Sequence, residues 1–252
     1  TGLALCLLGT YALHSRRTAN PLLDVSLFKI RTLAASVLGG FVTRLGVGGA
    51  PFLLPLLYQT GLGFTPVQSG MLMMPQALGA LCSKIFVQYE LTAVGYRTLL
   101  LGNTILLGVM LVLFGTISAA TPVWVICVQG AVYGILMSTQ FTAMNTLTFA
   151  DVPDAQSSKA SSLSGMFQQL SMSFGIAAAG LVTAKFGATP GDGQGEMITS
   201  VHHGFWFLGG VTILSASVFA ILRRNDGEGV SGHKEVPAIA HPPSSSHAGT
   251  AN

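Results

Sequence analysis

The sequence predicts an all-α transmembrane protein, and three observations support this fold class. Six long apolar stretches, each bounded by Gly, Pro or charged residues, fill most of the 252-residue chain. Charged residues make up 8% of the chain, against about 25% in soluble domains, and the mean hydropathy is +0.61. The stretches lack the two-residue alternation of membrane barrel strands, so helices are what satisfies their backbone polar groups in lipid.

The predicted helices are residues 33–57, 67–89, 98–117, 123–149, 161–186 and 205–222. At about 1.5 Å per residue, each reaches or approaches the ~30 Å thickness of the hydrocarbon core. Residues 2–13 are also apolar but would span only about 18 Å. We therefore interpret residues 1–14 as the end of a truncated transmembrane helix, residues 15–32 as a loop, and residues 33–222 as a six-helix bundle.

The first predicted helix, 33–57, has Arg44 at its centre. A charge there costs about 2.5–3.5 kcal/mol on insertion scales. Gly46, Gly49 and Pro51 interrupt the same helix, and interrupted helices of this kind face a cavity or another helix. We interpret Arg44 as a cavity residue that contacts an anionic or hydrogen-bonding substrate, or a carboxylate on another helix. The alternative is a structural lock, in which Arg44 binds carbonyls that the kink leaves free.

In the second predicted helix, 67–89, Pro75 predicts a bend, because a proline removes a backbone donor and crowds the preceding turn. The fourth helix, 123–149, carries polar and soft side chains at helical spacing, which places them on one face. These are Gln129, Tyr133, Met137, Gln140 and Met144. They suit the binding of apolar ligands with a few neutral hydrogen bonds, or they are ordinary contacts between helices.

In the fifth predicted helix, 161–186, Gln168 and Gln169 are read in the same way, with one of them facing the cavity. The sixth helix, 205–222, is followed by residues 223–252, which are rich in Gly, Pro, Ser and His. Such a composition cannot bury enough apolar surface to order itself, so we predict a disordered tail. The predicted cavity residues are Arg44, Gln129, Tyr133, Gln140, Asn145, Gln168 and Gln169.

Lys and Arg residues predict the orientation. Arg44, at the centre of a helix, belongs to neither side of the membrane. With the loop 15–32 on the cytoplasmic side, the alternation of the helices puts all but one of the other Lys and Arg residues on or near that side. They are Arg16, Arg17, Lys29, Arg31, Lys84, Arg97, Lys159, Arg223, Arg224 and Lys234. Only Lys185 falls on the opposite side. By the positive-inside rule we predict a multi-pass plasma (inner) membrane protein with a cytoplasmic tail. The net charge of +3 then reflects topology and does not indicate a nucleic-acid partner.

The acidic residues all lie in loops, at helix ends or in the tail, and no His lies within a predicted helix. Proton relays in transporters use a buried carboxylate or His, so the chain shows no evident protonation site of its own. It also lacks the Ser/His/Asp and metal-ligand clusters of hydrolases. We therefore predict no enzyme activity, no catalytic residue, no metal and no cofactor.

Several segments resemble the C-terminal half of major facilitator superfamily transporters. Residues 20–29, with Asn-Pro-Leu-Leu-Asp and then Leu-Phe-Lys, are similar to the segment before the C-terminal bundle of fourteen-helix drug:proton antiporters of the EmrB/QacA type. Ser-Gly-Met at 69–71, Pro75 and Gly79 resemble the next helix of those antiporters. Residues 144–151 and 169–175 resemble MdtD-type multidrug transporters, as does Arg44 followed by Leu-Gly-Val-Gly.

The cytoplasmic turn at 92–97 departs from the family pattern. It reads Thr-Ala-Val-Gly-Tyr-Arg, so it keeps Gly95 and Arg97 but lacks the acidic or amide residue and the first Arg. The resemblance covers about residues 2–222. The predicted helix-break or gating residues are Gly46, Gly49, Pro51, Pro75, Gly95 and Arg97.

The resemblance implies a six-helix C-terminal bundle of the major facilitator fold, preceded by the end of one linker helix. It implies proton-coupled export of amphipathic small molecules by alternating access, with the proton-coupling acidic residues in an N-terminal half. The partners would be membrane lipid, a small-molecule substrate and protons, and no oligomer is required. The alternatives are an uncoupled facilitator or channel, and a non-transporting membrane scaffold.

Overall fold

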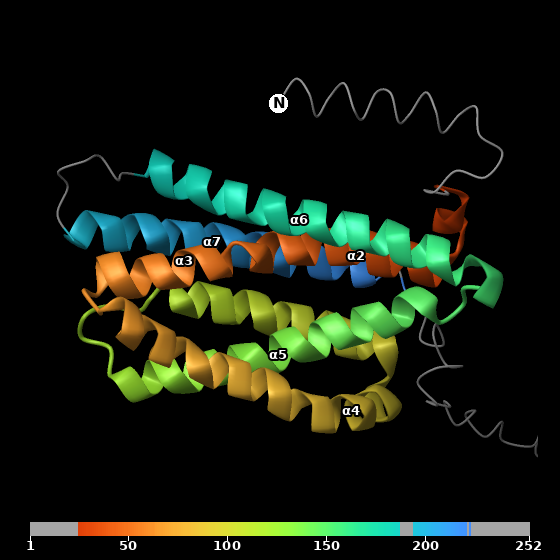
Figure 1. The fold of residues 1–252 in the computed structure, drawn as a ribbon, viewed down its shortest axis with the longest axis horizontal. Helices are drawn as coiled ribbons and strands as arrows, with labels where there is room; N and C mark the ends of the chain where they lie inside the picture. The colour runs from red at the N-terminus through yellow and green to blue at the C-terminus, as the bar shows by residue number, and fades with distance from the viewer. Residues whose placement is uncertain (1–24, 187–193, 221, 223–252) are drawn as a thin grey trace, which may run out of the picture.

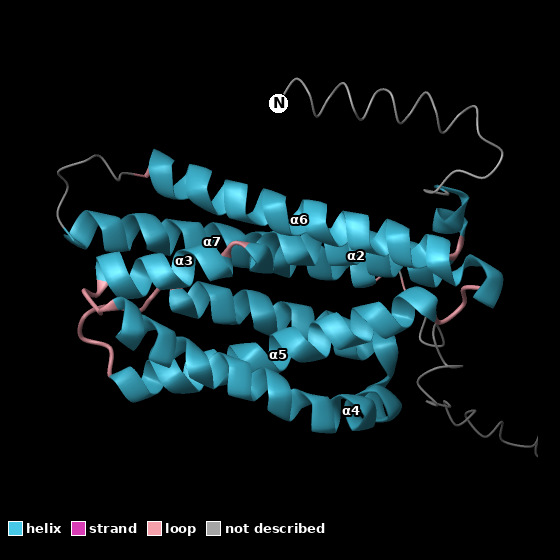
Figure 2. Ribbon diagram, in the orientation of Figure 1, coloured by secondary structure: helices cyan, strands magenta, loops and turns pink. Residues whose placement is uncertain are grey.

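The computed structural model describes residues 25–186, 194–220 and 222, and the regular secondary structure of these residues is entirely helical (Figures 1 and 2). This confirms the all-α transmembrane fold class. The predicted linker helix 1–14, most of the loop 15–32 and the tail 223–252 lie outside the described residues. A short helix, η1 (Val25–Lys29), precedes the first long helix.

The first transmembrane segment runs from Arg31 to Gly61 and consists of three helical pieces. They are α2 (Arg31–Gly48), α3 (Ala50–Leu56) and η2 (Leu57–Gly61), a final π-helical turn. The boundary between α2 and α3 falls at Gly49. Pro51 lies in the first turn of α3, where its missing N–H costs little, and Pro55 lies inside α3.

The next element, α4 (Pro66–Phe114), contains two predicted helices joined without a loop. Gly95 alone within it has a non-helical conformation, with φ 73° and ψ 163°, and glycine reaches this region at little steric cost. The chain reverses direction there (Figure 1). The predicted turn at 92–97 is therefore shorter than expected, because a single glycine provides the reversal and its neighbours stay helical.

Three further long helices complete the bundle: α5 (Val123–Phe149), α6 (Ser157–Lys185) and α7 (Gln194–Phe219). A short helix, η3 (Asp154–Gln156), lies between α5 and α6. The bounds of α5 are those that the sequence predicts. The bundle is two-layered in Figure 1, with α6, α7 and α2 side by side above the hairpin of α4 and the adjacent α5.

The sixth helix begins at Gln194, earlier than the predicted residue 205, and the expectation that no His lies in a span is wrong. The polar residues of the first turns are accommodated because carbonyl groups satisfy them. His202 Nε2 lies 2.8 Å from the carbonyl oxygen of Ile117, and His203 Nδ1 lies 2.8 Å from that of Thr199. The early start was not predictable from hydropathy, which assigns the polar imidazole to a loop.

Four segments of the described chain are long and apolar enough to cross a membrane: Arg31–Gly61, Pro66–Phe114, Val123–Phe149 and Gly195–Phe219. Because α4 folds back at Gly95, its 49 residues contain two of the predicted crossings. The remaining helix, α6, has 29 residues, enough length to cross, and its Ser and Gln residues make it less apolar than the others.

Glycines let the helices approach closely at two crossings. On α4, Gly79 faces the backbone of Ala131 on α5, and a Cβ atom at Gly79 would overlap the carbonyl oxygen of Ala131. On α6, Gly175 faces the carbonyl oxygen of Leu45 on α2 in the same way. Small residues at such contacts allow backbones to pack directly, which stabilises helix pairs in membranes.

Candidate functional site

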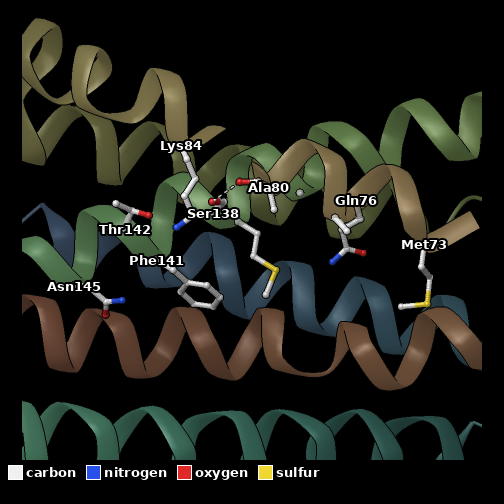
Figure 3. A pocket seen from close by; sticks show the side chains of 11 residues that line it. Met73, Gln76, Ala80, Lys84, Ser138, Phe141, Thr142 and Asn145 are labelled. Atoms are coloured by element: carbon white, nitrogen blue, oxygen red, sulfur yellow. Dashed lines mark hydrogen bonds between the residues drawn. The ribbon is translucent and has the colours of Figure 1, made fainter. Parts of the chain in front are cut away.

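A pocket of about 570 Å³ opens between the first half of α4 and α5 (Figure 3). Its volume lies in the range of about 300–1,000 Å³ that is usual for small-molecule sites. From α4 it is lined by Met73, Gln76, Ala77, Ala80 and Lys84. From α5 it is lined by Gly134, Met137, Ser138, Phe141, Thr142 and Asn145. On both helices these residues recur every three or four positions, so each helix presents one continuous face.

Small residues form the base of this pocket. A Cβ atom at Gly134 would overlap the backbone oxygen of Gln76, so α4 and α5 touch there. Ser138 Oγ donates a hydrogen bond of 2.9 Å to the carbonyl oxygen of Ala80, shown dashed in Figure 3. The longer side chains of Met73, Phe141 and Lys84 line the open space beside it.

Arg44 lies directly behind the pocket wall. It is 2% exposed, and its Nη2 donates a hydrogen bond of 3.2 Å to Asn145 Oδ1. Its guanidinium carbon lies 5.1 Å from the centre of the Phe141 ring, within the range of cation–π contacts. Gly40, one turn earlier on α2, leaves the room for this, since a Cβ atom there would lie 2.6 Å from Arg44 Nη1.

Arg44 contacts a side-chain amide of another helix, which neither interpretation of Arg44 had named. Its hydrogen-bond partner is the amide of Asn145 on α5, across the α2–α5 contact, and not a carbonyl of its own kinked helix. Its Nε is buried and has no hydrogen-bond partner. Asn145 and Phe141 both line the pocket. A role of Arg44 in the cavity therefore remains a prediction, in which Arg44 acts through these two residues.

Lys84 is a pocket residue that the sequence analysis did not name as a site residue. It was counted with the cytoplasmic charges, but it lies eleven residues, or about 16 Å of helix, before the bend at Gly95. Its side chain is exposed and points into the pocket in Figure 3. Its spacing of four residues from Ala80 and eight from Gln76 was the available signal, because that spacing puts the three on one face.

The predicted cavity residues Gln129, Tyr133 and Gln140 face α4 instead of the pocket. Tyr133 is fully buried, with its ring 5.5 Å from that of Phe114 in an edge-on contact. Gln129 Nε2 donates a long hydrogen bond of 3.4 Å to the carbonyl oxygen of Met110. None of the three lines the pocket, so their contact with a substrate remains a prediction.

Gln140 belongs to a buried hydrogen-bonded group between α5 and the second half of α4. Its Oε1 accepts from Asn103 Nδ2 at 2.7 Å, and its Nε2 donates to Thr104 Oγ1 at 2.7 Å. Asn103 Nδ2 also donates to the carbonyl oxygen of Leu136 at 2.8 Å. With both ends of the Gln140 amide satisfied, the group joins two helices in the way described for polar side chains in membranes.

The predicted glutamines of α6 are not brought to this pocket either. Gln168 is half-buried and Gln169 is exposed, and α6 packs mainly on α2 and α7. Their role in a cavity remains a prediction.

Of the predicted helix-break residues, Gly49 and Gly95 occupy the two breaks already described, Gly46 packs against Thr212 of α7, and Pro75 lies inside α4. Pro51 begins α3, and Arg97 lies just after the bend.

Most of the chain matches a known protein family: the sequence model of the Major Facilitator Superfamily matches residues 36–249. Three similar proteins are each called "Putative multidrug resistance protein MdtD". The one from Cronobacter sakazakii is 37% identical over 190 residues, which is 73% of this chain and 40% of the relative. The one from Escherichia coli is 38% identical over 178 residues, 71% of this chain and 38% of the relative.

The third, from Pectobacterium carotovorum, is 34% identical over 192 residues, which is 75% of this chain and 41% of the relative. The chain thus spans about two fifths of the length of the curated relatives it matches.

Proposed function

Because the chain belongs to the major facilitator superfamily, we propose that it forms the C-terminal bundle of a secondary transporter that exports amphipathic small molecules. The single observation that carries this proposal is the pocket between α4 and α5. Met and Phe side chains suit variable apolar bodies, and a few polar groups fix orientation. The names of the similar proteins, which refer to multidrug resistance, support the same substrate class.

We propose proton-coupled alternating access as the mechanism. In this scheme the bundle 33–222 rocks against a second bundle around the pocket, and the breaks at Gly49 and Gly95 are places where the helices adjust. Among the described residues that line the pocket there is no carboxylate. We propose that the proton-coupling group lies in an N-terminal half of the transporter, as the family resemblance implies.

The pocket assignment is tested by export measurements on Phe141. In the full-length protein, Phe141→Ala removes an apolar wall and the ring that faces Arg44, so we expect drug efflux to fall at least tenfold. The matched control is Phe149→Ala, at the end of the same helix, where the ring is 41% exposed and outside the pocket. Efflux is measured in cells that lack their main drug pumps, at equal membrane abundance. Equal efflux by the two variants would contradict the proposal.

We also propose that the protein lies in the plasma (inner) membrane with the tail and the end containing η1, Gly95 and η3 on the cytoplasmic side. Lys29, Arg31, Arg97 and Lys159 gather at that end of the bundle, whereas Lys185 ends α6 at the other. This distribution follows the positive-inside rule.

Cysteine labelling checks this orientation. Ala119, in the turn between α4 and α5, and Ala155, in η3, are both exposed and lie at opposite ends of the bundle. In an otherwise cysteine-free full-length protein, we expect a membrane-impermeant maleimide to label Ala119→Cys in intact cells. Ala155→Cys should be labelled only after the cells are opened. The reverse pattern would overturn the orientation.

A further inference from the structure

We propose that the pocket between α4 and α5 selects amphipathic anions, with the anionic head at Lys84 and Asn145 and the apolar body at Met73, Met137 and Phe141. This inference rests on the proposed function and names the substrate class of the same pocket. It starts from the charges and hydrogen-bonding groups that the described part of the pocket presents.

Lys84 supplies a fixed positive charge within the membrane-spanning part of α4. An ionised side chain at that depth costs free energy unless a partner or water compensates it. No Asp or Glu occurs among the described residues that line the pocket with Lys84. In Figure 3 its ammonium group points into the open space of the pocket. An anionic ligand in that space is therefore a partner that would compensate the charge.

Asn145 is turned so that it offers a donor to the same space. An arginine can only donate hydrogen bonds, so Arg44 Nη2 holds Asn145 by its Oδ1, at 3.2 Å. In Figure 3 the oxygen of Asn145 points toward α2 and its Nδ2 group points toward Phe141, along the pocket lining. Arg44 itself adds a second positive charge behind the Phe141 ring. The acceptor side of Asn145 is thus occupied, and its donor side is presented to a ligand.

Other residues of the same two helices suit an apolar body. Met73 and Met137 are flexible and polarizable, and Phe141 is a flat aromatic surface. The hydroxyl of Ser138 is engaged by the carbonyl oxygen of Ala80, so it competes little for an anionic head. The pocket therefore combines one cationic, donor-rich end with a soft apolar wall, which is the complement of an amphipathic anion.

Two probes with the same aromatic body and opposite charge test this inference. They are 1-naphthylacetate and 1-naphthylmethyl-trimethylammonium, whose binding to the full-length protein in lipid nanodiscs is measured by equilibrium dialysis. We expect the wild-type protein to bind the anion at least tenfold more tightly than the cation. Lys84→Gln should lower the affinity for the anion at least tenfold without lowering the affinity for the cation. Lys84→Glu should make the protein bind the cation more tightly than the anion. Lys185→Gln, at the far end of α6, is the matched control and should change neither affinity.

The inference is overturned if the wild-type protein fails to bind the anion, or binds the cation as tightly. It is also overturned if Lys84→Gln leaves the affinity for the anion within twofold of wild type. Phe141→Ala separates these results from a failure of the proposed function. If Phe141→Ala weakens both probes and lowers efflux while Lys84→Gln has no effect, the pocket is a substrate site without charge selection. If Phe141→Ala changes neither binding nor efflux, the proposed function itself fails.

Discussion

Replacing Arg44 by alanine is expected to abolish or strongly reduce export by the full-length protein while leaving its membrane insertion intact. Insertion should not suffer, because a charge at the centre of a span costs about 2.5–3.5 kcal/mol and alanine removes that cost. Export should suffer because Arg44 orients Asn145 and lies against the Phe141 ring, two residues of the pocket wall. The measurements are the efflux rate and the membrane abundance of the variant.

Arg44→Lys separates the charge of Arg44 from its geometry. Lysine keeps the positive charge but lacks the planar guanidinium that can meet an amide oxygen and a ring at once. We expect the Lys variant to retain part of the export activity and the Ala variant almost none. If Arg44→Ala lowers the melting temperature in detergent but leaves export per folded molecule unchanged, Arg44 is a structural lock. Normal export by Arg44→Ala would remove it from the site.

Replacing Gly79 by leucine is expected to destabilise the bundle more than other substitutions on α4. A Cβ atom at Gly79 would overlap the carbonyl oxygen of Ala131 on α5, and the obstacle is backbone, which cannot rotate away. Overpacking of this kind costs about 1–3 kcal/mol or more, and here it would also push apart the two helices that form the pocket. The melting temperature of the purified full-length protein should fall by several degrees, and the folded yield with it.

Gly70→Leu is the matched control for this prediction. Gly70 lies on the same helix but is exposed, and no atom lies within 4 Å of a Cβ atom placed there. The substitution should be neutral or slightly stabilising, because leucine is a better helix former than glycine by up to about 1 kcal/mol. Equal melting temperatures for the two variants would show that the α4–α5 contact at Gly79 is not as close as described.

Hydrophobic length and the positions of Gly and Pro were enough to predict most helices. The bounds of α5 are as predicted, and the interrupted first span has its break at Gly49. The bend at Gly95 occurs within a turn that the sequence did predict, but its form was not foreseen, since only backbone geometry shows that one glycine completes the reversal. The early start of α7 was not predicted, because hydropathy shows neither of the carbonyl groups that satisfy its histidines: His203 contacts Thr199 one turn earlier in α7, and His202 contacts Ile117, which lies far away in the sequence.

Which face of each helix meets which neighbour was not predictable in the same way. In water, an apolar stripe marks the buried face, but in lipid both the buried and the lipid-facing sides are apolar. On α4, Leu72 and Val87 are buried whereas Leu81 and Ile85 are largely exposed, and nothing in their chemistry separates the two pairs. Gln140 was therefore predicted to line the cavity, although it faces the second half of α4.

By itself, the sequence determined that this is an all-α membrane protein with a charge at the centre of its first span. Both features are local: the length of an apolar run decides whether it can cross the membrane, and a charge within such a run has a large free-energy cost wherever the helix packs. Only the tertiary structure decided that Arg44 reaches Asn145, that Gln140 binds Asn103 and Thr104, and that Lys84 faces a pocket. These contacts join residues far apart in the chain. They depend on how each helix is rotated about its own axis. Close glycine contacts and polar pairs fix this rotation, whereas the periodicity of apolar residues does not.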